Sequence, residues 1–147
     1  VLDIDSLLDS MKGCTNVYHA AAIVSYHKSD RKKMYRINVE GTANVVNSAL
    51  EVGISKLCHV SSVAAIGKSV TDVEISEQTE WVDSDDNTHY GITKHEAELE
   101  VFRGIEEGLN AIIVNPGFII GPGDFSRSSA SLFAKLEGGM TYYPPGG

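Results

Sequence analysis

The 147-residue sequence has few cysteines and prolines and no long uninterrupted apolar stretch. Its two cysteines, Cys14 and Cys58, do not have the spacing of a zinc or redox motif. We therefore expect reduced thiols, with Cys58 acting as a small buried apolar side chain. Because no apolar run approaches about 18 residues and no signal-peptide pattern is recognisable, the sequence predicts a cytoplasmic protein.

Basic residues are also scarce. The chain contains 12 lysines and arginines against 20 aspartates and glutamates, a formal net charge of −8. Binding to nucleic acid or to an anionic membrane requires a positive surface, so this composition disfavours both as partners. A hydrophobic content of 42% is ordinary for a soluble globular protein, and the length suits one domain with a buried core.

The hydrophobic pattern alternates between helix-like and strand-like segments. Helices are predicted at residues 5–11, at about 30–52 and at 90–109, and strands at 15–20, 56–62 and 111–115. The long helix is expected to bury the apolar positions Val39, Ala43, Val46 and Leu50 and to stop at Gly53. An acidic polar loop is expected at about 68–89. Strands alternating with helices indicate an α/β fold with a parallel sheet covered on both faces.

Tyr90 and Lys94 stand out because four residues, about one helical turn, separate them. They begin the predicted buried stripe of their helix, which continues through Ala97, Val101 and Ile105. A lysine on a buried stripe needs polar partners or an open cavity. An ammonium beside a phenol favours the phenolate form, so the pair is suited to donate and accept a proton.

Small or polar residues follow each of the three predicted strands. They are His19-Ala20-Ala21-Ala22, Ser61-Ser62 and Asn115-Pro116-Gly117. Because ligands of parallel sheets bind beyond the carboxyl ends of the strands, these residues predict one crevice. No second ligand stands at zinc spacing from His19, so we interpret it as a structural histidine and predict no metal site.

In this order the segments resemble the extended short-chain dehydrogenases/reductases, which include NAD(P)-dependent sugar-nucleotide epimerases and dihydroflavonol-reductase-like enzymes. Five motifs carry the resemblance: Val17-Tyr18-His19-Ala20-Ala21-Ala22, Asn38-Val39-Glu40-Gly41-Thr42, Val60-Ser61-Ser62 before Ala65-Ile66-Gly67, the Tyr90 and Lys94 pair, and Asn115-Pro116-Gly117. The resemblance implies a Rossmann-type three-layer parallel sheet, NAD or NADP as cofactor and a small-molecule substrate.

The resemblance also implies the catalytic roles. Tyr90 would be the general acid/base, and Lys94 would stabilise its phenolate and hydrogen-bond the nicotinamide ribose. Ser62 would hold the substrate oxygen, while Ser61 should point to the opposite face of its strand. Asn38 would interrupt the long helix and either anchor a water-mediated proton path through the lysine or only stabilise the kink.

The same resemblance implies a set of cofactor contacts. They would come from His19, Ala20, Ala21, Ser61, Tyr90, Lys94, Asn115, Pro116 and Gly117. Asn115 stands where the family usually has arginine, which puts the contacts of that loop in doubt. The choice between NAD and NADP stays open.

The family's glycine fingerprint, Gly-x-x-Gly-x-x-Gly, does not occur in this sequence. We therefore expect an internal fragment that lacks the first strand, glycine loop and helix. Residues 1–123 would be the central and C-terminal part of the dinucleotide-binding domain, and 124–147 would begin the substrate-binding region. Without the helix N-terminus that holds a pyrophosphate, the fragment alone should bind dinucleotide poorly and be inactive.

The residues around Ser62 narrow the chemistry that the resemblance implies. Val63-Ala64 stands where sugar-nucleotide 4,6-dehydratases carry Asp-Glu, which disfavours water elimination. Ile66 replaces a tyrosine found in many epimerases. These residues favour reduction of a ketone or aldehyde, or the reverse oxidation, as in dihydroflavonol-reductase-like enzymes. A nucleoside-diphosphate-sugar epimerase is the alternative, and a non-catalytic NAD(P)-binding sensor is the hypothesis from another class.

A homodimer is also implied, formed by the helices that carry Asn38 and Tyr90. Ile92, Leu99 and Phe102 lie off the predicted buried stripe and provide a second apolar face for such a contact.

Overall fold

The computed structural model describes residues 1–67, 75–119 and 139. The chain divides into two compact units, Val1–Pro116 and Gly117–Gly147. All described helices and strands belong to the first unit. The region predicted to begin substrate binding, 124–147, lies outside the described residues apart from Gly139.

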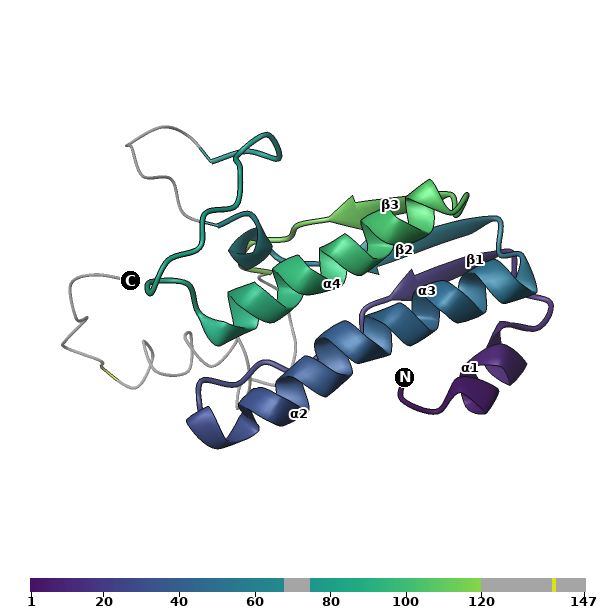
Figure 1. The fold of residues 1–147 in the computed structure, drawn as a ribbon, viewed down its shortest axis with the longest axis horizontal. Helices are drawn as coiled ribbons and strands as arrows, with labels where there is room; N and C mark the ends of the chain where they lie inside the picture. Colours follow the sequence, from purple (N-terminus) through teal and green to yellow (C-terminus); the bar gives the residue numbers. More distant parts are fainter. Residues whose placement is uncertain (68–74, 120–138, 140–147) are drawn as a thin grey trace. The chain divides into compact units, whose positions relative to one another are not determined.

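The described sheet has three parallel strands in the order β1-β2-β3 (Figure 1). These are β1 (Asn16–His19), β2 (Lys56–Val60) and β3 (Ala111–Val114). In the register, His19 pairs with His59, and His59 pairs with Ile113 on the other side. The three predicted strands are thus confirmed to within two residues at each end.

The predicted helices are also present (Figure 1). They are α1 (Ile4–Met11), a continuous rod of α2 (Arg31–Tyr35), the π-helical turn η2 (Arg36–Glu40) and α3 (Gly41–Val52), and α4 (His89–Glu106). Short 3₁₀ turns, η1 (Lys28–Asp30) and η3 (Val63–Ala65), precede the rod and follow β2. The rod ends at Gly53, whose φ of 75° is left-handed, as its predicted stop requires.

The π-helical turn changes which residues of the rod are buried. Val39 and Val46 are buried as predicted, but Ala43 and Leu50 are only half-buried. The fully buried positions of α3 are instead Gly41, Thr42, Val45, Val46, Ser48 and Ala49. A π turn inserts one extra residue, so the buried face beyond it is rotated from the position that a regular helix predicts.

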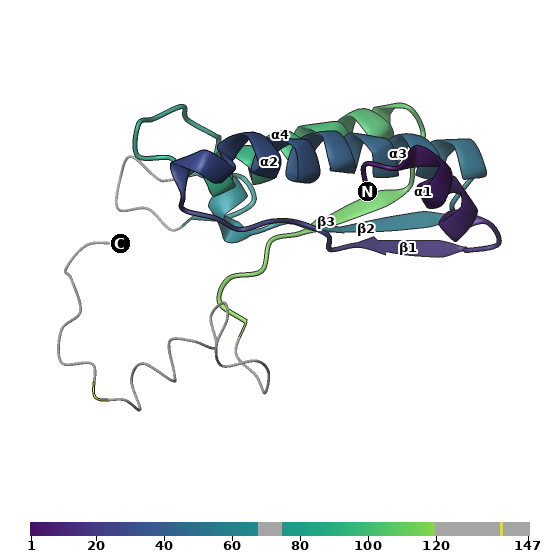
Figure 2. The same cartoon turned by 90° about the horizontal axis from the view of Figure 1, so that it is seen from below.

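Helices α2, α3 and α4 lie on one face of the sheet (Figure 2). Beneath them is an apolar core formed by Met11, Val45, Val46, Ala49, Ile54, Leu57, Val101 and Leu109. On the opposite face of the described sheet, Tyr18 is 78% exposed, and Ile112 and Val114 are also exposed. Cys58 alternates with the buried Leu57 and is only half-buried, which corrects the prediction that it would be buried.

Within the described part of the chain, no helix combines the length and apolarity needed to cross a lipid bilayer.

Candidate active site

The carboxyl end of β2 meets the first turn of α4. After Val60, the chain passes through Ser61 and Ser62 into η3. A Cβ atom added to Gly91 would lie 2.7 Å from the Ala64 carbonyl oxygen, so only glycine permits this close approach of α4 to η3. The first turn of α4, which carries Tyr90, therefore lies directly against the segment that follows Ser62.

Lys94 is buried at this junction, with only 2% of its surface exposed. Its Nζ donates a hydrogen bond to the Val60 carbonyl oxygen at 2.8 Å. Burial lowers the pKa of Lys94 from 10.5 to about 8, although the Glu98 carboxylate opposes this shift. The ammonium is thus fixed at the end of β2 and loses its proton more readily than an ordinary lysine does.

Ser61 and Ser62 face opposite sides of the chain, as predicted from strand alternation. Ser61 is buried on the side that faces the helices, whereas Ser62 is half-buried. The Ser62 Oγ accepts a hydrogen bond from the Ala64 backbone N–H at 3.2 Å and so caps η3. Because this bond uses a lone pair of Oγ, the hydroxyl proton of Ser62 stays free to be donated to a ligand.

Tyr90 is half-buried and lines a cavity of about 220 Å³. The other residues that line it are Ser25, Tyr26, His27, Arg31, Asn87, Thr88 and His89. Among the described residues around this cavity, Ser62 and Lys94 are absent. The fold thus brings the three predicted catalytic residues to one end of the sheet, while Tyr90 faces this cavity and Lys94 binds the strand end.

Asn38 is buried in the π-helical turn and connects two other segments. Its Oδ1 accepts from the Ile23 backbone N–H at 2.8 Å, and its Nδ2 donates to the Ile23 carbonyl oxygen at 2.9 Å and to Thr93 Oγ1 at 3.0 Å. The predicted interruption of the helix is confirmed. Since Thr93 precedes Lys94, the Asn38 amide positions the turn of α4 that carries Tyr90 and Lys94, and the predicted proton path would use the Asn38 backbone carbonyl.

The Asn38 carbonyl oxygen and the His19 ring both bind the hydroxyl group of Thr42. Thr42 Oγ1 donates to the Asn38 carbonyl oxygen at 2.6 Å and lies 2.9 Å from His19 Nε2. A hydroxyl has one proton, so His19 Nε2 must be the donor in the second contact. Burial, with the Lys94 charge, lowers the pKa of His19 to about 4. The ring is therefore neutral and satisfied, as predicted for a structural histidine; it is buried, while Ala20 and Ala21 are exposed.

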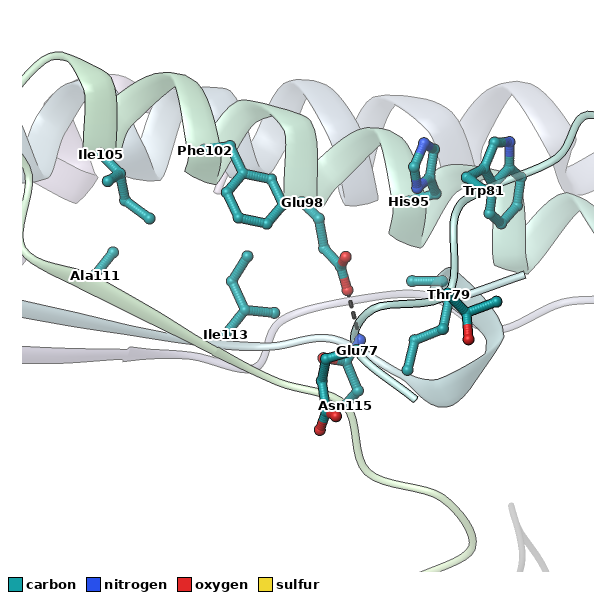
Figure 3. Close-up of a pocket in the computed structure, with 12 residues that line it drawn as sticks. Glu77, Thr79, Trp81, His95, Glu98, Phe102, Ile105, Ala111, Ile113 and Asn115 are labelled. Carbon is teal, nitrogen blue, oxygen red and sulfur yellow. Dashed lines mark hydrogen bonds between the residues drawn. The ribbon is translucent and has the colours of Figure 1, made fainter. Parts of the chain in front are cut away.

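Asn115 braces the segment that carries Ser62. Its Nδ2 donates to the Ser62 carbonyl oxygen at 3.1 Å and to Glu98 Oε1 at 2.6 Å (Figure 3). The Pro116 carbonyl oxygen accepts from the Val63 backbone N–H at 3.2 Å. Both amide protons of Asn115 are thereby committed to the protein. Its predicted cofactor contact would have to use the amide oxygen.

Sequence reasoning missed two buried polar residues, Glu98 and His59. Glu98 lies one turn after Lys94, and a second residue at this spacing on the same buried face was a usable signal. His59 alternates with Leu57 and Ser61, which places it on the inward face of β2. The predicted stripe also fails at Ile105, which is 37% exposed.

A second cavity, of about 410 Å³, lies between α4 and β3 (Figure 3). Phe102, Ile105, Ala111 and Ile113 form its apolar part, and Glu98 points from α4 toward Asn115 at its polar end. Nearby, Trp81 stacks on His95 with ring centroids 4.2 Å apart. Ser62, Tyr90 and Lys94 do not line this cavity within the described part of the chain, so it is separate from the predicted catalytic residues.

Among residues 1–67, 75–119 and 139, no group of three or more histidine, cysteine, aspartate or glutamate side chains is placed to hold a metal ion.

Several known proteins are similar to this chain. Sterol demethylase protein B of Methylococcus capsulatus is 32% identical over 148 residues, which are 98% of this chain and 44% of that protein. A putative dihydroflavonol 4-reductase of Synechocystis is 35% identical over 123 residues, 84% of this chain and 36% of that protein. The chain therefore spans less than half the length of these relatives.

A solved structure is also similar to this chain. The crystal structure of gox2253 is 38% identical, has a TM-score of 0.78, and is matched over 90% of this chain and 41% of that one. The predicted Rossmann-type fold is confirmed by this likeness. The sequence pattern of the NAD dependent epimerase/dehydratase family matches residues 1–139. The chain belongs to the NAD dependent epimerase/dehydratase family.

Proposed function

We propose that the whole protein is an NAD(P)-dependent oxidoreductase that acts on a carbonyl or hydroxyl carbon of a small molecule, as dihydroflavonol-reductase-like enzymes do. The observation that carries the proposal is the buried ammonium of Lys94, held by the Val60 carbonyl two residues before Ser62 and one turn after Tyr90. A buried charge is costly, and its retention at the strand end that precedes Ser62, one helical turn after Tyr90, suits proton transfer.

The residues present fit the nicotinamide half of such a cofactor. Lys94 uses one of its three N–H donors on Val60, which leaves donors for a ribose hydroxyl. Ala20 and Ala21 are exposed after β1, and their small size permits close approach of a flat ring. NAD or NADP, when bound, supplies or accepts the hydride.

The protein groups would divide the remaining work. Tyr90 would exchange a proton with a substrate oxygen in the cavity of about 220 Å³ that it lines. Ser62, which does not line that cavity among the described residues, would have to reach the same oxygen from the end of β2, where its hydroxyl proton is free to stabilise negative charge. Lys94 would keep its positive charge near the phenol and favour phenolate.

Tyr90→Phe tests this proposal. Turnover of the whole enzyme should fall by a factor on the order of 10³ because the proton donor is removed, while cofactor affinity stays within a few-fold. Tyr35→Phe is the matched control, because Tyr35 is exposed on α2. Equal turnover in the two variants would remove Tyr90 from the mechanism and would favour the non-catalytic sensor.

Sugar-nucleotide epimerisation is the second candidate, because the family description itself includes epimerases. An epimerase returns the hydride to the same substrate, so it turns over without consuming reduced cofactor. Incubation with nucleoside-diphosphate hexoses, followed by NMR detection of the epimer, separates it from net reduction of a ketone or aldehyde.

We also propose a cytoplasmic homodimer, in which the Asn38 and Tyr90 helices of two copies pack together. On α4, Leu99 and Phe102 are 52% and 51% exposed, and they would be covered in such a contact. Sedimentation equilibrium of the whole protein should give twice the monomer mass. Leu99→Glu should shift it to monomer, whereas Glu107→Gln at the end of the same helix should not.

A further inference from the structure

The strongest unexplained feature outside the proposed catalytic residues is a pair of buried polar side chains at the carboxyl end of β2, one on the strand and one directly after it. His59 is 1% exposed and Ser61 is 4% exposed. Both ring nitrogens of His59 and the Oγ of Ser61 are buried and have no hydrogen-bond partner among the described residues. Native proteins rarely leave such groups unpaired, because each costs about 1–3 kcal/mol.

Their position ties this pair to Lys94. The carbonyl that binds the Lys94 ammonium belongs to Val60, the residue between His59 and Ser61. Ser61 directly follows the last residue of β2 and stands two positions after His59, so the two buried side chains lie on the same face of the extended chain. The ammonium, bound to the carbonyl between them, has two further N–H donors, and its charge acts on the His59 ring.

The charges around His59 identify the kind of partner that it can take. His19 packs beside it on β1 with ring centroids 5.1 Å apart, and Lys94 faces it from α4, with Glu98 one turn further. Burial and the Lys94 charge lower the pKa of His59 to about 3, so the ring is neutral and offers one donor and one acceptor. A second cation is excluded because the Lys94 ammonium would repel it. An anion is disfavoured because it would lose its hydration on entering this buried site. A neutral molecule that both donates and accepts suits all three groups.

We propose that an internal water molecule is bound by His59 and Ser61 and accepts a hydrogen bond from the Lys94 ammonium. Such waters typically make about three hydrogen bonds to buried polar groups, which is the number available at this site. The water accepts one N–H of the ammonium and the Val60 carbonyl accepts another, so the third N–H remains for the cofactor. In the proposed function, on which this role rests, His59 and Ser61 are positioning residues that act through Lys94.

The water site predicts an effect on the titration of Lys94. When His59 is replaced by leucine, the water loses a partner and the ammonium is less hydrated, so its pKa should fall below the wild-type value of about 8. The alkaline limb of the Lys94 titration should move down by about one pH unit. His59→Gln keeps a donor and an acceptor and should restore most of the shift. Ser61→Ala should give a smaller shift in the same direction.

The titration is measured by NMR of the whole protein with ¹³C-labelled lysine, and Lys94→Met assigns the resonance. Ser48→Ala is the matched control, because Ser48 Oγ is also buried with no partner among the described residues but belongs to α3 rather than to the end of β2. A crystal structure should show water within hydrogen-bond distance of His59, Ser61 and Lys94. An unchanged Lys94 titration in both His59→Leu and Ser61→Ala, or a dry site in the crystal, would overturn the proposal.

This measurement does not depend on turnover. If Tyr90→Phe keeps full activity, the proposed function fails while the water site stands. If the titration is unchanged but Tyr90→Phe is inactive, only the water site fails.

Discussion

The two ends of the layer between the sheet and the helices are built from different chemistry. At one end, the side chains of α3, α4 and β2 are apolar and include Val46, Val101 and Leu57. At the carboxyl ends of the strands, the same three elements bury Thr42, Lys94 and His59. Strand β2 changes from one kind to the other within two residues, between Leu57 and His59.

The difference separates what stabilises the fold from what would perform the chemistry. Burying apolar surface contributes about 25 cal/mol per Å² to folding. Buried hydrogen bonds contribute little net free energy, and buried charges are often unfavourable. The lowered pKa values of His19, His59 and Lys94 show that this end of the protein disfavours positive charge. We infer that the burial of apolar side chains at one end offsets the unfavourable free energy of burying polar and charged side chains at the other.

Lys94→Met gives the largest expected effect on this comparison. Turnover of the whole enzyme should fall by a factor on the order of 10³, because the charge that favours phenolate is removed. The free energy of unfolding at pH 7 should not fall, since the buried charge is removed with it. Lys56→Met, in the exposed first position of β2, is the control for both measurements. A large loss of stability in Lys94→Met would show that the polar end also stabilises the fold.

Leu57→Ala should lower the stability and leave the turnover nearly unchanged, the reverse of Lys94→Met. Leu57 is completely buried in the apolar core, so its truncation should lower the free energy of unfolding by about 2–5 kcal/mol in denaturant titration. The turnover of the folded fraction should change little. Ile112→Ala, at an exposed position of β3, should cost much less. A loss of turnover in Leu57→Ala without a loss of stability would contradict the separation of the two ends.

How far the sequence alone predicted the molecule differs between these two ends. The apolar end follows from periodicity: the predicted strands lie within two residues of the observed ones, and the helices within three, since α4 ends at Glu106 rather than at 109. The rotation of the buried face on α3 could not be predicted, because a π turn depends on tertiary contacts such as those between Asn38, Ile23 and Thr93.

At the polar end, the sequence predicted which end of the sheet carries the buried lysine and the serines, but not which atoms they bind. The spacing of Tyr90 and Lys94 and the serines after β2 identified this end of the sheet. The bond from Lys94 to a backbone carbonyl could not be predicted, since backbone partners leave no trace in residue identity. Asn115 was expected to contact the cofactor, and the structure shows that its amide protons bind Glu98 and Ser62.

Acid should destabilise the protein through the two buried histidines of the polar end. His19 and His59 have pKa values of about 4 and about 3 in the folded protein against 6.5 when unfolded. As the pH falls below 6.5, the two histidines bind protons in the unfolded chain but not in the folded chain. The free energy of unfolding therefore decreases from its value at neutral pH. Each histidine contributes a slope of at most about 1.4 kcal/mol per pH unit. Thermal unfolding between pH 7 and pH 5 measures it. His59→Leu should remove about half of the slope that His19 and His59 contribute. Equal slopes in the wild type and His59→Leu would mean that His59 does not resist protonation in the folded protein.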